Sequence, residues 1–237
     1  MQKIKVTLSA NAGVCIDLAG KRVWVDALHN GKVRGFSTLN PQLQQWVLSD
    51  PSFAGPDLMV YTHCHGDHYS RELTRQAMEK WPGAKVILPR QDFPKQILLW
   101  QEKHMLEFED LNLEFLRLPH EGAQYADVPH YGLLLETLGK TVLLPGDCAL
   151  ADSALKDAIA GRKIDIAILD FPWITLRKGQ RFIEEVIRPK HILVYHLPFE
   201  EDDISGYRQS AEGAAKQLSG FDIRLLQAPM QSEEINI

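Results

Sequence analysis

The chain has 237 residues, 45% of them hydrophobic and 24% charged, a composition that suits an ordinary globular protein with a packed interior. The formal net charge of −5, without a block of like charges, argues against nucleic acid as the main partner. Three cysteines without a CxxC pair favour neither a disulfide framework nor a thiolate zinc site. The first residues lack the apolar core of a signal peptide and no apolar run approaches about 18 residues, which predicts a cytoplasmic protein without a membrane partner.

The first third of the chain predicts an antiparallel meander followed by one helix. Its strands are 4–8, 13–18 and 22–25, with turn signals at 11–13 and 19–21. The helix spans 41–48, with Asn40 as its cap and Pro41 at its first position. A short apolar strand at 58–61 then leads directly into a cluster of histidines.

The rest of the chain predicts alternating strands and helices. The helices are 70–80, 91–102, 151–160, 179–187 and 203–218, and the strands are 85–88, 105–109, 111–118, 132–138, 141–144, 164–169, 191–194 and 222–226. No internal repeat or long linker occurs, which favours one domain over residues 1–237. Strands that precede helices in both halves of the chain suit two packed sheets with helices on their outer faces.

The cluster after strand 58–61 predicts a metal site. In an extended backbone, side chains two residues apart point the same way, so His63 and His65 converge on one ion. Gly66 frees the following turn, where Asp67 and His68 can face a second, adjacent ion. Imidazole and carboxylate ligands suit zinc, iron or manganese. Strand alternation directs Cys64 away from these histidines, as a filler of the core.

The pattern His63-x-His65-x-Asp67-His68 behind a short apolar strand resembles the signature of the metallo-β-lactamase superfamily. The segments that agree with this resemblance are Asn11-Ala12-Gly13-Val14, Val25-Asp26, Pro145-Gly146-Asp147 and a late histidine, His196, at a strand end. Within the superfamily the chain looks most similar to the compact group that includes the ascorbate-6-phosphate lactonase. The resemblance implies a four-layer αββα sandwich over 1–237, an α/β fold of two mixed β-sheets flanked by helices.

The resemblance also implies a ligand set, position by position. It assigns His63 and His65 to the first ion, Asp67 and His68 to the second, Asp147 to a bridging carboxylate and His196 to the second ion.

The first ion needs a third histidine from the loop before hairpin 132–144, where both His120 and His130 occur. We prefer His120, which lies at the mouth of strand 111–118, and leave His130 as a residue that faces substrate or packs in the loop. The remaining histidines, His29, His104 and His191, are interpreted as structural.

The predicted function is that of a metal-dependent hydrolase acting on a small-molecule lactone, ester or phosphoester. Two divalent ions, with zinc preferred and manganese or iron open, activate a hydroxide, and Asp67 is the catalytic residue that also orients it. Trp173, in an aromatic segment at 171–174, is a candidate for substrate binding.

Two other classes of function stay open. One is a nuclease or phosphodiesterase of the tRNA-processing type, which the lack of a long basic arm disfavours. The other is a non-hydrolytic metal or redox module, although superfamily members with a di-iron centre typically carry glutamate where this chain has His65. No oligomeric state is predicted.

Overall fold

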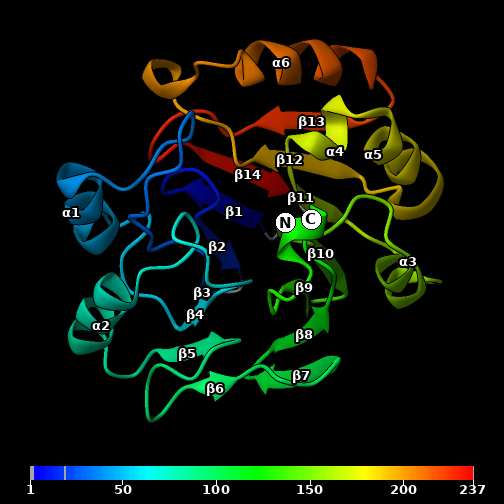
Figure 1. The fold of residues 1–237 in the computed structure, drawn as a ribbon. Helices are drawn as coiled ribbons and strands as arrows, with labels where there is room; N and C mark the ends of the chain where they lie inside the picture. Colours follow the sequence, from blue (N-terminus) through cyan, green and yellow to red (C-terminus); the bar gives the residue numbers. More distant parts are fainter. Residues whose placement is uncertain (1–2, 19, 237) are drawn as a thin grey trace. The chain divides into compact units, whose positions relative to one another are not determined.

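The computed structural model describes residues 3–18 and 20–236; Met1, Gln2, Ala19 and Ile237, including part of the turn predicted at 19–21, lie outside the described residues. The chain divides into two compact units. The first unit comprises Met1–Leu99, His196–Ser205 and Leu226–Ile237, and the second unit comprises Trp100–Tyr195 and Gly206–Leu225. Each unit is built on one seven-stranded mixed sheet (Figure 1).

The sheet of the first unit combines a meander with a parallel half. In spatial order its strands are β14 (Ser232–Asn236), β1 (Lys3–Leu8), β2 (Val14–Leu18), β3 (Lys21–Val25), β4 (Leu58–Val60), β5 (Lys85–Leu88) and β6 (Ile97–Leu98). Neighbours from β14 to β3 pair antiparallel and those from β3 to β6 pair parallel. Strands β1, β2 and β3 confirm the predicted meander.

Two helices of the first unit supply the crossovers that parallel strands require. Helix α1 (Pro41–Ser49) joins β3 to β4 and helix α2 (Arg71–Lys80) joins β4 to β5 (Figure 1). Both begin as predicted, because the side chain of Asn40 accepts a hydrogen bond from Leu43 N and that of Ser70 from Leu73 N. The first unit also contains a short 3-10 helix, η3 (Glu200–Asp202).

The sheet of the second unit also has a parallel and an antiparallel half. Its strands in spatial order are β13 (Asp222–Leu225), β12 (His191–Tyr195), β11 (Ile166–Asp170), β10 (Lys140–Leu144), β9 (Tyr131–Thr137), β8 (Leu111–Arg117) and β7 (Lys103–Phe108). The neighbours from β13 to β10 pair parallel, and the rest pair antiparallel. The helices are η1 (Ala123–Tyr125), α3 (Ser153–Ile159), α4 (Pro172–Thr175), α5 (Arg177–Phe182), the π-helical turn η2 (Ile183–Ile187) and α6 (Tyr207–Gln217).

Several predicted elements of the second unit are confirmed. The hairpin of β9 and β10, the strands β11 to β13 and the helix α3, which the Asp152 side chain caps, occupy the positions expected. Helix α6 lies along β13 (Figure 1). In the described part of the chain, no helix combines the length and the apolar character that crossing a lipid bilayer demands.

The helix predicted at 91–102 is wrong. Pro94 interrupts the segment, and the side-chain oxygen of Gln96 accepts hydrogen bonds from the backbone N–H groups of Asp92 and Phe93, both at 2.8 Å. These contacts replace the bonds of a helical turn, and only the two-residue strand β6 follows. His104, which was interpreted as structural, lies in strand β7, which follows this segment.

The last helix and the last strand also differ from the prediction. The last helix begins at Tyr207 rather than at 203, because Gly206 adopts the left-handed conformation with φ 71° directly before it. Strand β14 was not predicted, since its sequence SEEIN has only one buried residue, Ile235. Pairing with β1 nevertheless makes it the edge of the first sheet.

Candidate metal centre

The histidine cluster lies where two parallel strands of the first unit end. Val25 at the end of β3 pairs with Val60 at the end of β4, so the residues that follow both strands emerge at the same edge of the sheet. Such carboxyl edges are where open α/β sheets place their ligand sites. Asp26 follows β3 and the segment Thr62–His68 follows β4, which brings the residues of two distant motifs together.

Asp26 is the hub of this edge, although the sequence analysis had given it no role. Its residue is fully buried and its backbone is in the left-handed region with φ 51°. Its carboxylate accepts hydrogen bonds from Thr62 N (2.8 Å) and Thr62 Oγ1 (2.6 Å), and His68 Nδ1 lies 2.9 Å from Oδ2. A buried carboxylate requires such partners, because desolvation of its charge is costly.

These hydrogen bonds assign the protons of two imidazoles. The Thr62 hydroxyl donates its one proton to Asp26, so at the 3.0 Å contact between Thr62 Oγ1 and His63 Nδ1 the ring must be the donor. His68 likewise donates from Nδ1 to Asp26. In both rings Nε2 then carries the lone pair, which is the state that a metal ligand needs.

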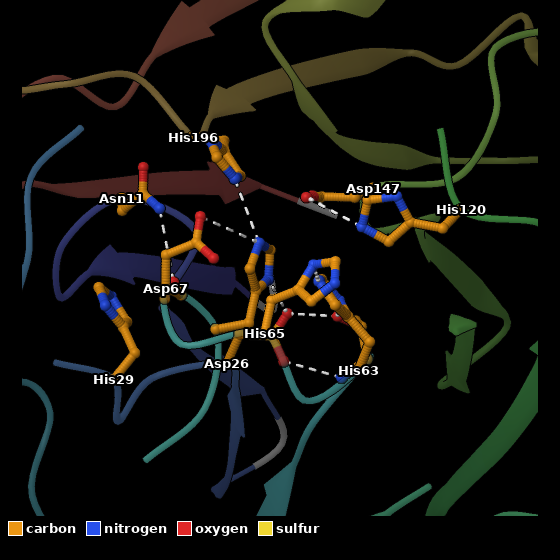
Figure 2. Close-up of polar contacts among 12 residues, drawn as sticks. Asn11, Asp26, His29, His63, His65, Asp67, His120, Asp147 and His196 are labelled. Carbon is orange, nitrogen blue, oxygen red and sulfur yellow. Dashed lines mark hydrogen bonds and ion pairs between the residues drawn. The ribbon is translucent and has the colours of Figure 1, made fainter. Parts of the chain in front are cut away.

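The nitrogen atoms that carry these lone pairs face other imidazoles. His63 Nε2 lies 3.0 Å from His65 Nδ1, and His68 Nε2 lies 3.2 Å from His196 Nε2. An oxygen of Asp67 lies 4.0 Å from His68 Nε2. Figure 2 shows the side chains of Asp26, His63, His65, Asp67 and His196 in one cluster.

Two overlapping groups of the first unit have the spacing of metal ligands. The ligand atoms of Asp26, His63 and His68 lie within 4.8 Å of one another, and so do those of Asp67, His68 and His196. Imidazole nitrogens and carboxylate oxygens are the donor set of divalent transition metals. The group of Asp67, His68 and His196 fits such an ion, whereas the carboxylate of Asp26 already accepts the Nδ1 proton of His68.

Asn11, from the turn between β1 and β2, connects the two loops that carry ligands. Its side-chain NH₂ group donates to the backbone carbonyl of Asp67 at 3.4 Å, and its backbone carbonyl accepts from His196 N at 3.0 Å. Its backbone has φ 47°, a conformation that asparagine tolerates better than most residues. Asn11 belongs to one of the segments that carry the resemblance. In the structure it holds the loop of Asp67 next to the loop of His196.

A close backbone contact holds the cluster from its other side. Gly31 N donates to the carbonyl of Gly66 at 2.7 Å. A Cβ added to Gly31 would lie 2.4 Å from the carbonyl carbon of Gly66, closer than real side chains approach backbone. Glycine at position 31 therefore permits the loop after β3 to pack directly on the turn between His65 and Asp67.

His29 is structural, as interpreted from the sequence. It is fully buried, with Nε2 placed 3.0 Å from the carbonyl of Ala10. Burial lowers the pKa of His29 to about 4, so the ring is neutral at pH 7. Its hydrogen bond holds the loop after β3 against the turn that carries Asn11.

The second unit holds the other predicted ligands side by side. His120 Nε2 lies 3.9 Å from an oxygen of Asp147, and an isolated β-bridge joins His120 to Cys148 (Figure 2). His120 Nδ1 lies 2.8 Å from the carbonyl of Glu121, which as an acceptor places the ring proton on Nδ1. His120 thus carries its ring proton on Nδ1, as His63 and His68 do.

His130 packs against the ring of His120. The two rings meet edge to face with centroids 5.5 Å apart, and His130 Nδ1 lies 3.3 Å from the carbonyl of Leu118. His130 is fully buried. Its backbone carbonyl also accepts from Leu118 N, so it closes the loop that presents His120.

The side chain of Trp173, a predicted substrate contact, is fully buried in α4, with its ring 5.7 Å from that of Phe182. Gly179 permits this packing, since a Cβ there would lie 2.4 Å from the carbonyl oxygen of Trp173. A role in substrate binding stays a prediction. Cys64 is half-buried, and burial raises the pKa of its thiol to about 12, consistent with an unreactive filler.

Comparison with known proteins identifies the fold. No protein-family model matches the chain, and no curated protein matches it in sequence. Among solved structures it is similar to Igni18, described as a novel metallo hydrolase from the archaeon Ignicoccus hospitalis KIN4/I, with TM-score 0.68, 16% identity and 99% of both chains covered. It is also similar to the metallo-β-lactamase fold protein YhfI from Bacillus subtilis, with TM-score 0.67, 13% identity, 99% of this chain and 100% of YhfI covered.

A third similar structure is CmlA, a diiron β-hydroxylase from Streptomyces venezuelae, with TM-score 0.66 and 12% identity. The match covers 99% of this chain but 54% of CmlA, so the chain spans about half the length of that protein. At these identities the likeness concerns the fold, and the fold of this chain is the metallo-β-lactamase fold.

Proposed function

We propose that the chain is a metal-dependent hydrolase that binds two divalent ions, with zinc as the first choice and manganese or iron as alternatives. The observation that carries the proposal is the pairing of imidazole nitrogens in the first unit, at 3.0 Å for His63 and His65 and 3.2 Å for His68 and His196. Ligands about 2.0–2.1 Å from one tetrahedral zinc ion lie roughly 3.3 Å apart. Each pair is therefore spaced to share one ion.

The proposed ligand set keeps the division suggested by the resemblance. His63 and His65 bind one ion, and Asp67, His68 and His196 bind the other. Asp147 is the proposed bridging carboxylate. For the remaining histidine, the 3.9 Å distance between His120 Nε2 and an oxygen of Asp147, the proposed bridging residue, supports His120 rather than His130.

The protein's own residues prepare the chemistry. These residues would hold two divalent ions, which would lower the pKa of a water molecule and polarise the oxygen of a scissile carbonyl or phosphoryl group. Asp26 accepts the Nδ1 proton of His68 directly and holds the Thr62 hydroxyl that accepts from His63, so both rings keep one tautomer and one orientation. Asp67 is the proposed residue that orients the attacking water.

For the substrate we propose a small-molecule lactone, ester or phosphoester, in keeping with the resemblance to the ascorbate-6-phosphate lactonase group. The formal charge of −5 favours a small molecule over a nucleic acid, which makes a nuclease the weaker proposal. A non-hydrolytic iron centre is the second candidate, because CmlA shares the fold and is described as a diiron β-hydroxylase.

The test combines metal analysis with a panel of lactone, phosphodiester, phosphonate and thioester substrates. The proposal expects about two ions per chain and turnover of one substrate class. Asp67→Ala should lose at least about a hundredfold in kcat while circular dichroism stays unchanged. Asp110→Ala, which removes an exposed carboxylate of the second unit, is the matched control and should keep full turnover.

Each other outcome decides against part of the proposal. Wild-type turnover in Asp67→Ala removes Asp67 from the catalytic role. Bound iron with oxygen consumption replaces the hydrolase by the second candidate. A protein that binds no divalent ion overturns both.

A further inference from the structure

A pocket of the first unit lies beside the histidine cluster. It encloses about 640 Å³ and is lined by the loop that follows Gly31 and by residues of η3. The lining residues that matter here are Lys32, Arg34, Phe36, Thr38, Glu201 and Asp202. Its size is in the range of pockets that bind small molecules.

Contacts at both ends of its loop connect this pocket to the proposed metal ligands. Directly before Lys32, Gly31 donates to the carbonyl of Gly66 within the histidine cluster. Four residues further on, the ring of Phe36 meets that of His196 edge to face, with centroids 5.1 Å apart. The loop segment 31–36 therefore touches the cluster at both of its ends, and Phe36 both lines the pocket and contacts His196.

The far wall is held by a buried serine. Ser37 Oγ accepts a hydrogen bond from Phe199 N and donates one to Asp202 Oδ2, both at 2.7 Å. Ser37 is 1% exposed, so these bonds are shielded from water. They tie the loop to the segment that follows His196 and make the shape of the pocket a fixed feature of the first unit.

The charges that line the pocket are not neutralised by one another. Lys32 and Arg34 are exposed and form no hydrogen bond or ion pair with any residue in 3–18 or 20–236. Asp202 is already the acceptor of Ser37, and neither it nor Glu201 lies within ion-pair distance of the two cations. The Oγ1 atom of Thr38 is buried without a hydrogen-bond partner in the described structure and adds a polar group to the wall.

We propose that this pocket selects the substrate by an anionic group, a carboxylate or a phosphate, which Lys32 and Arg34 bind. The inference rests on the hydrolase proposed above, since it places the substrate beside His196. Arginine and lysine bind such groups through charge-assisted hydrogen bonds, and two cations without internal partners need not break an ion pair to do so. Phe36 offers an apolar face between the anionic group and the cluster.

Equilibrium binding to the purified, metal-bearing full chain tests this inference. Isothermal titration with inorganic phosphate, succinate and the neutral diamide of succinate compares two anions with an uncharged analogue. We expect binding of at least one anion and none of the diamide. Lys32→Met with Arg34→Met should weaken the Kd of that anion by about tenfold or more, and Glu201→Gln should strengthen it about twofold.

A matched control keeps the number of removed charges equal. Arg177→Met with Lys178→Met removes one arginine and one lysine from α5 in the second unit and should leave anion binding unchanged. Tighter binding of phosphate than of succinate assigns the pocket to a phosphate group, and the reverse order assigns it to a carboxylate. If the double variant melts at a lower temperature, Lys32→Gln and Arg34→Gln are measured singly.

The inference is overturned if neither anion binds, if the diamide binds as well as the anions, or if Lys32→Met with Arg34→Met retains wild-type affinity. Metal content is measured in the same samples. Unchanged metal content together with unchanged anion affinity refutes the pocket while leaving the hydrolase proposal intact. Absence of metal from the wild-type chain refutes the hydrolase proposal itself.

Discussion

The Nδ1 atom of His68 lies 2.9 Å from Oδ2 of Asp26, and neither side chain is exposed to solvent. Burial raises the pKa of the Asp26 carboxyl, while the hydrogen bonds from His68 and Thr62 act in the opposite direction. The contact crosses from the residue after β3 to the turn after β4. It makes one carboxylate responsible for the orientation of two proposed ligands.

Asp26→Asn should weaken metal affinity by about 10–100-fold, because Oδ1 and Oδ2 of Asp26 both accept hydrogen bonds, whereas asparagine has one oxygen and its NH₂ group would face a donor of Thr62 or His68 in either orientation. Competition with a chromophoric chelator measures this change. Asp57→Asn is the control, since Asp57 accepts from Arg22 N in the same unit without touching the histidines. Equal metal affinity of wild type and Asp26→Asn would show that the carboxylate does not orient ligands.

Asp26 acts on His63 through the Thr62 hydroxyl and on His68 directly, and Thr62→Val separates these two branches. The variant keeps the side-chain shape but removes the hydroxyl between Asp26 and His63, so the tautomer of His63 is released while that of His68 is retained. We expect one of two metal ions to bind about tenfold more weakly, with the other unchanged. A titration in which both ions weaken equally contradicts the assignment of separate branches.

The choice between His120 and His130 is testable by paired variants. His120→Asn should reduce bound metal and turnover, because His120 Nε2 faces Asp147 in the second unit. His130→Asn should retain metal and instead lower the thermal midpoint, since His130 is buried and its Nδ1 lies against the Leu118 carbonyl. Metal analysis and thermal unfolding of both variants decide the matter; loss of metal in His130→Asn alone reverses the preference.

Gly31→Ala should destabilise the protein by about 2–3 kcal/mol, because its Cβ collides with backbone that cannot move independently. The collision is at 2.4 Å from the carbonyl carbon of Gly66, so metal affinity should fall as well. Gly83→Ala is the control, since a Cβ there has nothing within 4 Å and Gly83 has no positive φ. Urea unfolding of both variants compares the effects, and equal stability contradicts the close approach.

His29 predicts a specific pH dependence of stability. Burial lowers its pKa from 6.5 to about 4, so in acid the unfolded chain binds a proton that the folded chain refuses. The stability associated with the neutral ring is complete above pH 6.5 and is lost as the pH falls toward 4, by about 3 kcal/mol. His29→Gln should remove this part of the acid sensitivity. Identical pH profiles for wild type and His29→Gln refute it.

The strands and helices that position the site follow from local signals. Asn40 was expected to cap α1 from its residue type and does so, and Ser70 caps α2 at the start of the helix predicted at 70–80. The helix predicted at 91–102 does not form, because Pro94 interrupts it and the side chain of Gln96 accepts hydrogen bonds from backbone N–H groups. Strand β14 could not be recognised, because an edge strand needs few buried residues and its partner is over 200 positions away.

The site was predictable to the extent that its ligands form a local pattern. His63, His65, Asp67 and His68 are close in sequence, and the structure brings His196 to them across 128 positions, as the resemblance implied. The role of Asp26 was hidden because a lone aspartate after a strand has no distinguishing pattern. The segment Val25-Asp26, which agrees with the resemblance, was the available signal. The burial of Asp26 and its three hydrogen bonds reveal that it positions Thr62 and His68.

The pairing of β1 with β14 also bears on the order in which the chain matures during synthesis. Strand β1 gains its neighbour β14 only after more than 200 further residues have been made, and His68 gains His196 only 128 positions after its own synthesis. In the sheet of the second unit, by contrast, neighbouring strands are consecutive in the chain, from β7 to β13. The local cluster at 63–68 is therefore synthesised well before His196, and the proposed second ion gains its last ligand of the first unit only at that later stage.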